Sequence, residues 1–451
     1  MTTPASALLT LALFLPPQDA GPAGEELDAA RQWGQWRGPL ATGEAPHADP
    51  PIEWGETRNV RWKLPLPGLG HGSPVVWGER IFLTTAIPFG DALEPLPDLA
   101  PGAHDNLPVT HPHRFEVLAV DRREGRVLWQ RRVREELPHE GGHVSGSLAS
   151  ASPVTDGELV FAFFGSRGLY ALTVDGQPVW SRDLGVIQTK HGHGEGSSPA
   201  LHGDSLVVNC DHEGQSFVTA LDKRTGEERW RVLRDEVTSW ATPLMVEHGG
   251  RTQVVISGTG RLRGYDLETG EVLWECGGLA NNVVASPVAG GGLVFAGSSY
   301  EKKAMLAIRL EGAEGDLGET DRVAWLRRRR TPYVPSPLLY GDALYFLNHY
   351  QSVLCRVEAQ TGTEPTGPFR LPGIENVYAS PVGAAGRLYV TDLSGATLVL
   401  SAGEEPQALA LNQLNDRFSA SAALAGRELF LRGERYLYCI AEEEDGLPAG
   451  D

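Results

Sequence analysis

Short apolar strands separated by polar turns run through most of this chain, and one ten-residue pattern recurs among them. Residues Leu221 to Trp230 comprise an apolar strand ending in Asp, a turn containing Thr and Gly, and a second strand ending in Trp. Closely similar stretches occupy residues 120–129 and 265–274. The last two copies are separated by about 44 residues, and a repeat of this length indicates a fold built by stacking one unit.

The residues of this pattern suit a hairpin that packs on a neighbour. Asp222 can bond its own backbone two residues further on and so nucleate the turn. Gly226 stands where a four-residue hairpin loop needs a positive φ. Because a single hairpin cannot bury its apolar face alone, we expect Trp230 to pack on the next unit.

A second pattern precedes each hairpin: Ser-Pro, an apolar strand, a Gly turn and another strand. Pro is tolerated at the first position of a strand. The copies begin at Ser73, Ser152, Ser198, Thr242, Ser286, Ser336 and Ser380, and in degenerate form at Ser421. Together the two patterns predict units of four antiparallel strands, A to D, which is the composition of a propeller blade.

The order of the strands predicts how the ring closes. The chain begins with a lone strand D around Trp62 and ends with strands A, B and C between Ser421 and Ile440. Pairing these two fragments completes one blade and removes the free edges. We therefore predict an all-β, eight-bladed β-propeller of four-stranded antiparallel blades over residues 59–442, preceded by an irregular strap at 24–58 and followed by an acidic tail at 443–451.

The N-terminus carries the features of a targeting segment. Residues 7–15 form an apolar run of signal-peptide length that is too short to span a bilayer, and Ala20 or Ala23 would suit cleavage, although no Lys or Arg precedes the run. We predict a signal peptide at 1–23, a periplasmic or secreted location, and no transmembrane span.

Charge and cysteine content narrow the function classes. The net charge of −19 argues against nucleic acid as a partner, because phosphate binding needs a basic stripe. The one basic run, Arg327 to Arg330, is expected to be a solvated outer strand. The four cysteines form no CxxC pair and lie in or beside apolar strands, which predicts buried free thiols.

The Asp-x-x-Thr-Gly-x-x-x-Trp hairpins and the Ser-Pro-Val strands resemble the repeats of the pyrroloquinoline-quinone-dehydrogenase-like propellers, which include periplasmic outer-membrane assembly factors of the BamB type. Residues 36–39 and 196–199 also resemble bacterial proteins of this superfamily whose activity is not established. The resemblance implies either a quinone-dependent dehydrogenase or a non-catalytic scaffold. The adjacent Cys-Cys pair of the quinone alcohol dehydrogenases is missing, and their Glu, Asn and Asp set around Ca²⁺ has no residue-by-residue match here.

Histidines concentrate on one face of the predicted ring. In an antiparallel meander the B–C and D–A loops share a face, here called the top face, and ten of the thirteen histidines fall in these loops. A long B–C insertion at residues 85–114 lies on the same face, and long loops on a rigid scaffold commonly carry function.

The segment from His191 to Glu195 is a candidate metal site. If it is extended, alternation places His191, His193 and Glu195 on one side, and these groups suit Zn²⁺ or another transition metal. A polar ligand pocket and simple structural hydrogen bonding remain open alternatives for the same residues.

We therefore predict a monomeric binding or scaffold protein that takes a protein or a small-molecule ligand on its top face. The alternative is a quinone- or metal-dependent oxidoreductase at the mouth of blades 1–3, with pyrroloquinoline quinone and Ca²⁺, or a transition metal, as cofactor. The candidate binding residues are His71, His143, His191, His193, Glu195, Asp211, His212, Trp240, Asn282, Tyr333, Tyr378 and Arg417.

Overall fold

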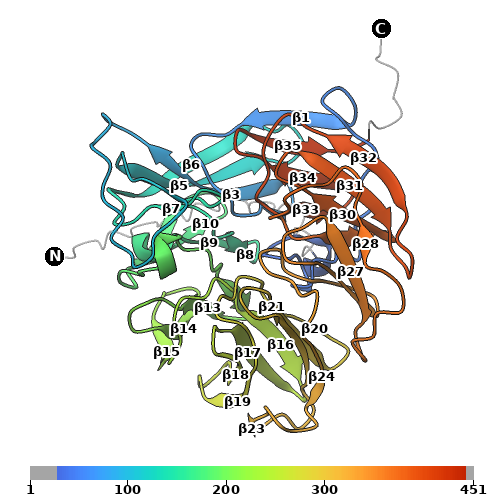
Figure 1. Ribbon diagram of the computed structural model, residues 1–451. Helices are drawn as coiled ribbons and strands as arrows, with labels where there is room; N and C mark the ends of the chain where they lie inside the picture. Colours follow the sequence, from blue (N-terminus) through green and yellow to red (C-terminus); the bar gives the residue numbers. More distant parts are fainter. Residues whose placement is uncertain (1–27, 443–451) are drawn as a thin grey trace, which may run out of the picture.

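The computed structural model describes residues 28–442, which form a ring of β-sheets around a central axis (Figure 1). The predicted signal peptide at 1–23, residues 24–27 of the strap and the acidic tail at 443–451 lie outside the described residues. In the part that is described, no helix has the length and apolar character needed to cross a membrane.

The first half of the ring holds blades 1 to 4. Blade 1 contains β2 (Val75–Trp77), β3 (Arg80–Pro88), β5 (His113–Asp121) and β6 (Val127–Glu136); blade 2 contains β8 (Val154–Thr155), β9 (Leu159–Phe163), β10 (Leu169–Thr173) and β11 (Pro178–Arg182). Blade 3 contains β12 (Ala200–His202), β13 (Ser205–Cys210), β14 (Phe217–Asp222) and β15 (Glu228–Leu233); blade 4 contains β16 (Leu244–His248), β17 (Arg251–Ser257), β18 (Arg261–Asp266) and β19 (Val272–Gly277), with β23 (Gly315–Asp316) added in parallel.

Blades 5 to 8 complete the ring. Blade 5 contains β20 (Val288–Gly290), β21 (Leu293–Ser298), β22 (Ala304–Arg309) and β24 (Val323–Arg327); blade 6 contains β25 (Leu338–Tyr340), β26 (Ala343–Leu347), β27 (Val353–Glu358) and β28 (Phe369–Arg370). Blade 7 contains β29 (Val382–Ala384), β30 (Arg387–Thr391), β31 (Ala396–Ser401) and β32 (Ala408–Gln413); blade 8 contains β33 (Ala423–Ala425), β34 (Glu428–Arg432), β35 (Tyr436–Ile440) and β1 (Val60–Pro65). The prediction of an eight-bladed propeller is confirmed.

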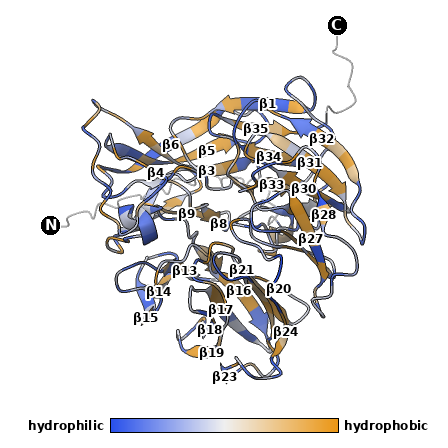
Figure 2. Cartoon of the chain, in the orientation of Figure 1, coloured by the Kyte–Doolittle hydropathy of each residue, from blue (hydrophilic) through white to orange (hydrophobic). Residues whose placement is uncertain are grey.

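The burial of each strand follows from its place in the blade. Each sheet packs face to face with two neighbouring sheets, so a middle strand such as β9 or β13 is buried at every position. Such strands read as continuous apolar runs in the sequence, and Figure 2 shows them as hydrophobic segments joined by hydrophilic loops. The outer strand β15 faces solvent, and Trp230 is its one buried residue.

The recurring turn has the predicted chemistry. The Arg224 backbone N–H donates to the Asp222 side chain over 2.9 Å, and Gly226 adopts a φ of +68°. The local sequence therefore determines the hairpin, and its repetition generates the ring.

Pairing of β1 with β35 closes the propeller, as predicted. Trp62 lies opposite Cys439 and Leu64 opposite Leu437 in an antiparallel register. Figure 1 shows the two strands side by side, blue beside red. The Glu428 carboxylate adds a polar link, because it accepts from Arg61 on β1 and from Arg122 in blade 1.

The strap before β1 crosses the face opposite the histidines. Its only helical turn in the described residues is η1 (Ala29–Arg31), and its backbone then bridges to Val76 in blade 1, Gly383 in blade 7 and Gly426 in blade 8. Among the described residues 28–58, η1 is the one named helix or strand. The strap ties together blades that are distant in the sequence.

Arg37 of the strap is a buried cation held by backbone oxygens. Its guanidinium donates to the carbonyls of Pro337 and Pro381 over 2.7 Å each and to that of Thr42 over 3.1 Å. Burial lowers the pKa of Arg37 to about 9. Since two of these carbonyls belong to blades 6 and 7, Arg37 links the entrances of both inner strands.

The Ser-Pro pattern forms a belt around the axis. In blades 1 to 7 the backbone N–H of the residue at the start of strand A donates to the hydroxyl of its counterpart in the next blade, over 2.8–3.0 Å. The belt runs through Ser73, Ser152, Ser198, Thr242, Ser286, Ser336, Ser380 and Ser421. This bonding explains why a hydroxyl residue recurs at this position.

Two further predictions have different outcomes. All four cysteines are buried and free, as predicted. The prediction of a solvated Arg327–Arg330 run is wrong at Arg327, which is buried and donates to Glu364 over 2.7 Å. This pairing offsets the cost of burying the charge.

Candidate functional site: a top-face cavity with two unlike walls

A cavity of about 400 Å³ opens on the top face near the propeller axis. Nine of the twelve predicted binding residues line it: His71, His143, His191, His193, Glu195, Trp240, Asn282, Tyr333 and Tyr378. Asp211, His212 and Arg417 do not. The part of the twelve residues in binding stays a prediction, but the structure brings nine of them to one cavity.

Trp36 of the strap forms the floor of the cavity. Its indole Nε1 donates to the Ser286 hydroxyl over 3.3 Å. Trp36, Thr242 and Ser286 also line a second cavity, of about 480 Å³, on the strap side. The strap and the hydroxyl belt therefore separate the top cavity from the opposite face.

Four histidines make one wall of the cavity. They are His104 from the blade 1 insertion, His143 from the loop that enters blade 2, and His191 and His193 from the loop that enters blade 3. Their ring centroids lie 4.9 Å apart for His104–His191, His104–His193 and His143–His193, and 5.3 Å apart for His191–His193.

Local backbone pairing holds this wall together. Strand β4 (Asn106–Leu107) of the insertion pairs with β7 (Gly142–His143), and the His143 N–H donates to the His193 carbonyl over 3.1 Å. The Asn106 side chain donates to the His191 carbonyl over 2.6 Å. The long insertion is thus an ordered part of the cavity.

The segment around His191 is not extended. The predicted metal site of His191, His193 and Glu195 assumed an extended segment, so that assumption does not hold. The segment forms the 3-10 turn η3 (Lys190–Gly192), with His191 at a φ of +59° and Gly192 at +67°. Burial and repulsion from the neighbouring imidazoles lower the pKa of His193 to about 4, so His193 is neutral at physiological pH.

Stacked aromatic side chains make the opposite wall. Tyr333 stacks on His349 with ring centroids 4.5 Å apart and an interplanar angle of 7°, and on Tyr300 at 5.8 Å. Tyr350 stacks on Tyr378 at 5.8 Å and contacts His349 at 4.3 Å. This wall comes from the B–C and D–A loops of blades 5 to 7, and its aromatic side chains line the cavity.

Glu195 contacts other groups than the two histidines near it in sequence. Its carboxylate accepts from the Ser166 N–H and from Arg167 Nη1, each over 3.0 Å. Its ligand atoms lie within 4.8 Å of those of His139 and Glu140. Burial, opposed by hydrogen bonds from Thr189, raises the pKa of Glu140 to about 7.

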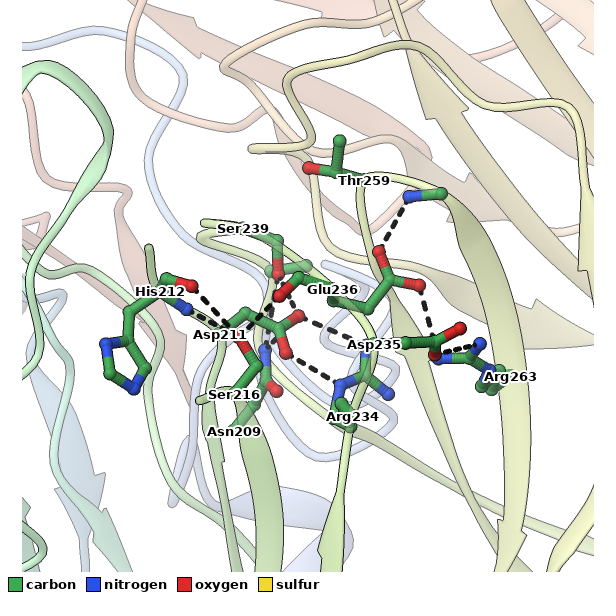
Figure 3. Close-up of polar contacts among 12 residues, drawn as sticks. Asn209, Asp211, His212, Ser216, Arg234, Asp235, Glu236, Ser239, Thr259 and Arg263 are labelled. Atoms are coloured by element: carbon green, nitrogen blue, oxygen red, sulfur yellow. Dashed lines mark hydrogen bonds and ion pairs between the residues drawn. The ribbon is translucent and has the colours of Figure 1, made fainter. Parts of the chain in front are cut away.

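Asp211 and His212 belong to a structural network instead of the cavity. Both side chains of the Asp211–Arg234 ion pair are fully buried, with Arg234 Nε 2.7 Å from Oδ1. The Ser239 hydroxyl donates to the same carboxylate over 2.6 Å. Figure 3 shows this carboxylate facing Arg234 and Ser239, while the imidazole of His212 points away from them.

His212 itself braces its own loop. Its backbone N–H donates to the Ser216 hydroxyl over 2.9 Å, and its ring contacts the Gln215 carbonyl over 3.1 Å. Arg417, the third residue outside the cavity, is exposed and pairs with Glu434 over 3.2 Å.

His71 lines the cavity, and its two ring nitrogens are buried without a partner. Within residues 28–442 neither of its ring nitrogens has a hydrogen bond. Burial, aided by the positive charge of Arg432, lowers the pKa of His71 to about 4. Arg432 is itself fully buried, and burial lowers its pKa to about 9.

Sequence reasoning missed several cavity residues: Trp36, His104, Tyr300, His349 and Tyr350. His104 and His349 were assigned to top-face loops, but their loop positions carried no signal that they reach the axis. Tyr300 and Tyr350 lie in B–C loops outside the recurring patterns of the repeat. Trp36 comes from the strap, whose path no local pattern predicts.

Comparison with known proteins supports the repeat interpretation. Residues 113–366 match the family described as outer membrane protein assembly factor BamB. A search of curated proteins gives no match.

The solved structures that are similar to this chain include proteins of different kinds. BamB from Moraxella catarrhalis is 15% identical, with 79% of this chain and 99% of that chain covered and a TM-score of 0.54. A europium-containing methanol dehydrogenase is 9% identical, with 89% of each chain covered and a TM-score of 0.60. A quinohemoprotein alcohol dehydrogenase from Pseudomonas putida HK5 is 10% identical, with 94% and 83% covered and a TM-score of 0.54. At such identities the likeness concerns the fold alone.

Proposed function

Because this chain belongs to the BamB family of β-propellers with pyrroloquinoline-quinone-like repeats, we propose that it is a binding protein that takes a planar, polar small molecule into its top-face cavity and performs no catalysis of its own. Other proteins with this fold include both an assembly factor and dehydrogenases, so the fold does not select the function. The chemistry of the cavity must do so.

The observation that carries this proposal is a floored cavity with two unlike walls. Its volume of about 400 Å³ lies in the range of small-molecule sites, which is about 300–1,000 Å³. The wall around Tyr333 and His349 supplies aromatic rings on which a flat ligand can pack, edge to face or offset. The imidazoles of the opposite wall and the hydroxyls of the belt supply hydrogen bonds at the edge of such a ring.

The cavity fits the alternative, a quinone oxidoreductase, poorly. Pyrroloquinoline quinone carries three carboxylates, yet no Lys or Arg is among the residues that line the cavity. Ca²⁺ prefers several oxygen ligands. Glu195 is the one carboxylate in the lining described here, and Arg167 and Ser166 already engage it.

A fluorescent planar probe tests the proposal. Lumichrome, a neutral flat heterocycle, should bind the purified, metal-free chain with about micromolar affinity, measured by quenching of its emission. Tyr333→Ala should weaken binding at least about tenfold, because the variant loses stacking contacts. Tyr436→Ala is the matched control, since Tyr436 lies on β35 away from the cavity.

Two results would count against the proposal. One is a failure of lumichrome and of related flat heterocycles to bind at all, and the other is equal binding by Tyr333→Ala. A quinone spectrum that develops with pyrroloquinoline quinone and Ca²⁺ would favour the oxidoreductase instead.

A further inference from the structure

We propose that His104, His191 and His193 form a binding site for one divalent transition metal ion of the zinc, copper or nickel type on the histidine wall of the cavity. This inference goes beyond the proposed function, because the metal binds whether or not an organic ligand is present. It is based on three observations: the tautomers of the three rings, their spacing and their backbone.

The first observation is that backbone carbonyls hold each of the three imidazoles. His104 Nδ1 lies 2.8 Å from the Gly102 carbonyl, His191 Nδ1 lies 3.0 Å from that of Pro101, and His193 Nε2 lies 3.2 Å from that of His104. A carbonyl only accepts, so each of these nitrogens carries the proton. The other nitrogen of each neutral ring therefore offers a lone pair.

Those lone pairs are uncommitted. Among the hydrogen bonds of residues 28–442, none involves Nε2 of His104, Nε2 of His191 or Nδ1 of His193. A histidine whose second ring nitrogen donates to a carbonyl is the usual metal ligand, because that bond sets the tautomer and raises the basicity of the free nitrogen.

The second observation is that the rings have the spacing of coordinated imidazoles. With a metal–nitrogen distance of about 2.1 Å, a ring centre lies about 3.2 Å from the metal, and two rings at the tetrahedral angle lie about 5.2 Å apart. The three observed separations are 4.9, 4.9 and 5.3 Å. In the described structure the nitrogens of these three rings are not among the groups that lie within 4.8 Å of one another, so we propose that the rings turn when they bind the ion.

The third observation is that the backbone is strained where it presents two of the ligands. His191 adopts a φ of +59°, a conformation that costs a non-glycine residue of order 1 kcal/mol. The turn is completed by Gly192 at +67° and Gly194 at +83°. This backbone directs His191 and His193 towards His104 of the insertion, 4.9 Å away from both rings.

His143 differs from the other three histidines. Its Nδ1 accepts from the Ser145 backbone N–H over 3.2 Å, so its neutral ring carries the proton on Nε2. In this tautomer it offers no lone pair to the metal. It lies 4.9 Å from the His193 ring and can donate a hydrogen bond to a group held there.

A different cluster has its ligand atoms closer together, but it holds a competing cation. The atoms of His139, Glu140 and Glu195 lie within 4.8 Å of one another. The guanidinium of Arg167, nearly fully buried, is already 3.0 Å from the Glu195 carboxylate. Its charge opposes a second cation, so the three imidazoles of the cavity wall are the better site.

Three nitrogen ligands leave coordination positions open on the cavity side, since all three histidines line the cavity. Neutral imidazoles without a carboxylate suit zinc, copper and nickel better than Ca²⁺ or Mg²⁺. A metal here would therefore present an exchangeable water to whatever enters the cavity.

Metal titration of the full chain tests this proposal. After removal of metal with a chelator, the protein should take up one equivalent of Zn²⁺, and Co²⁺ in its place should give the intense visible bands of tetrahedral coordination. His104→Ala, His191→Ala and His193→Ala should each weaken Zn²⁺ binding at least about tenfold. His248→Ala is the matched control and should bind as the original chain does, because His248 lies outside the cavity and pairs with Glu311.

Several outcomes would overturn the proposal: no stoichiometric uptake, a Co²⁺ spectrum of octahedral type, or unchanged affinity in the three variants. A loss of affinity in Glu195→Gln equal to that of His193→Ala would assign the site to His191, His193 and Glu195 instead. Near-ultraviolet circular dichroism checks the folding of each variant. If a variant does not fold, the Co²⁺ spectrum of the original chain still tests the proposal. Lumichrome binding is measured without metal, so the two proposals fail separately.

Discussion

The indole Nε1 of Trp230, on the outer strand of blade 3, donates a hydrogen bond of 2.7 Å to the carbonyl of Leu267 in blade 4. The ring then covers Gly270 of the next Thr-Gly turn, where an added Cβ would lie 2.7 Å from the ring. The same docking joins Trp62 to Gly125, Trp129 to Gly176, Trp180 to Gly226 and Trp325 to Gly362. The predicted packing of Trp230 on the next unit is thus confirmed, and it recurs around the ring.

Substituting a glycine that is covered by a tryptophan should lower the free energy of unfolding more than substituting an uncovered glycine that also has a positive φ. Gly270→Ala should destabilise the protein by about 2–4 kcal/mol, because it adds a steric clash with Trp230 to the cost of a positive φ. Gly250→Ala is the control, since Gly250 has a φ of +76° with no heavy atom near the added Cβ, and it should cost about 1 kcal/mol. Urea unfolding measures both, and equal losses would contradict the docking.

Glu428 should stabilise the closure of the ring. Its buried carboxylate bonds Arg61 of β1 and Arg122 of blade 1, so Glu428→Ala should cost about 2 kcal/mol by leaving two arginines without their acceptor. The exposed pair of Arg417 and Glu434 is the comparison, and Glu434→Ala should cost less than about 0.5 kcal/mol. Chemical denaturation of the two variants distinguishes a closure contact from a surface one.

Asp211 should act on stability and not on binding. Asp211→Ala leaves Arg234 buried without its partner and should cost about 3–5 kcal/mol. Lumichrome and Zn²⁺ affinities, measured at a temperature where the variant is folded, should stay within about twofold of the original chain, because Asp211 does not line the cavity. A loss of lumichrome or Zn²⁺ affinity with unchanged stability would indicate that Asp211 contributes to binding.

His71 should make the protein sensitive to acid. The unfolded chain protonates this histidine near its usual pKa of about 6.5, whereas burial holds the folded pKa of His71 at about 4. Stability is therefore fully present above pH 6.5 and falls as the pH drops towards 4. His71→Met should remove about 2 kcal/mol of the stability difference between pH 7 and pH 4, as measured by urea unfolding at the two pH values. An unchanged pH dependence would show that other groups dominate.

Much of the fold was predictable from local patterns. The turn at Asp222 and Gly226 depends on contacts within a few residues, and a repeated hairpin must stack to bury its faces. Exceptions came from departures from the repeat: Trp274 bonds Gln253 of its own blade, because blade 5 has a long C–D connection at residues 310–322 where blade 4 has its Thr-Gly turn. The local sequence around Arg327 indicates an exposed side chain, because its partner Glu364 lies 37 residues further along the chain.

The candidate site was only partly predictable. Strand order assigns a loop to a face, which is why nine predicted residues reach one cavity. Strand order does not say which side chain of a loop points to the axis. Asp211 and His212 belong to top-face loops, yet one pairs with Arg234 and the other braces its own turn.

The sequence by itself determined the repeat, the number of blades and the closure of the ring, because these follow from turn chemistry and apolar patterning that act over short stretches. Only the tertiary structure decided how His104 meets His191 and His193, and how Trp36 reaches Ser286. Those contacts join loops 85 or more residues apart, and their positions depend on how neighbouring blades and the strap pack together.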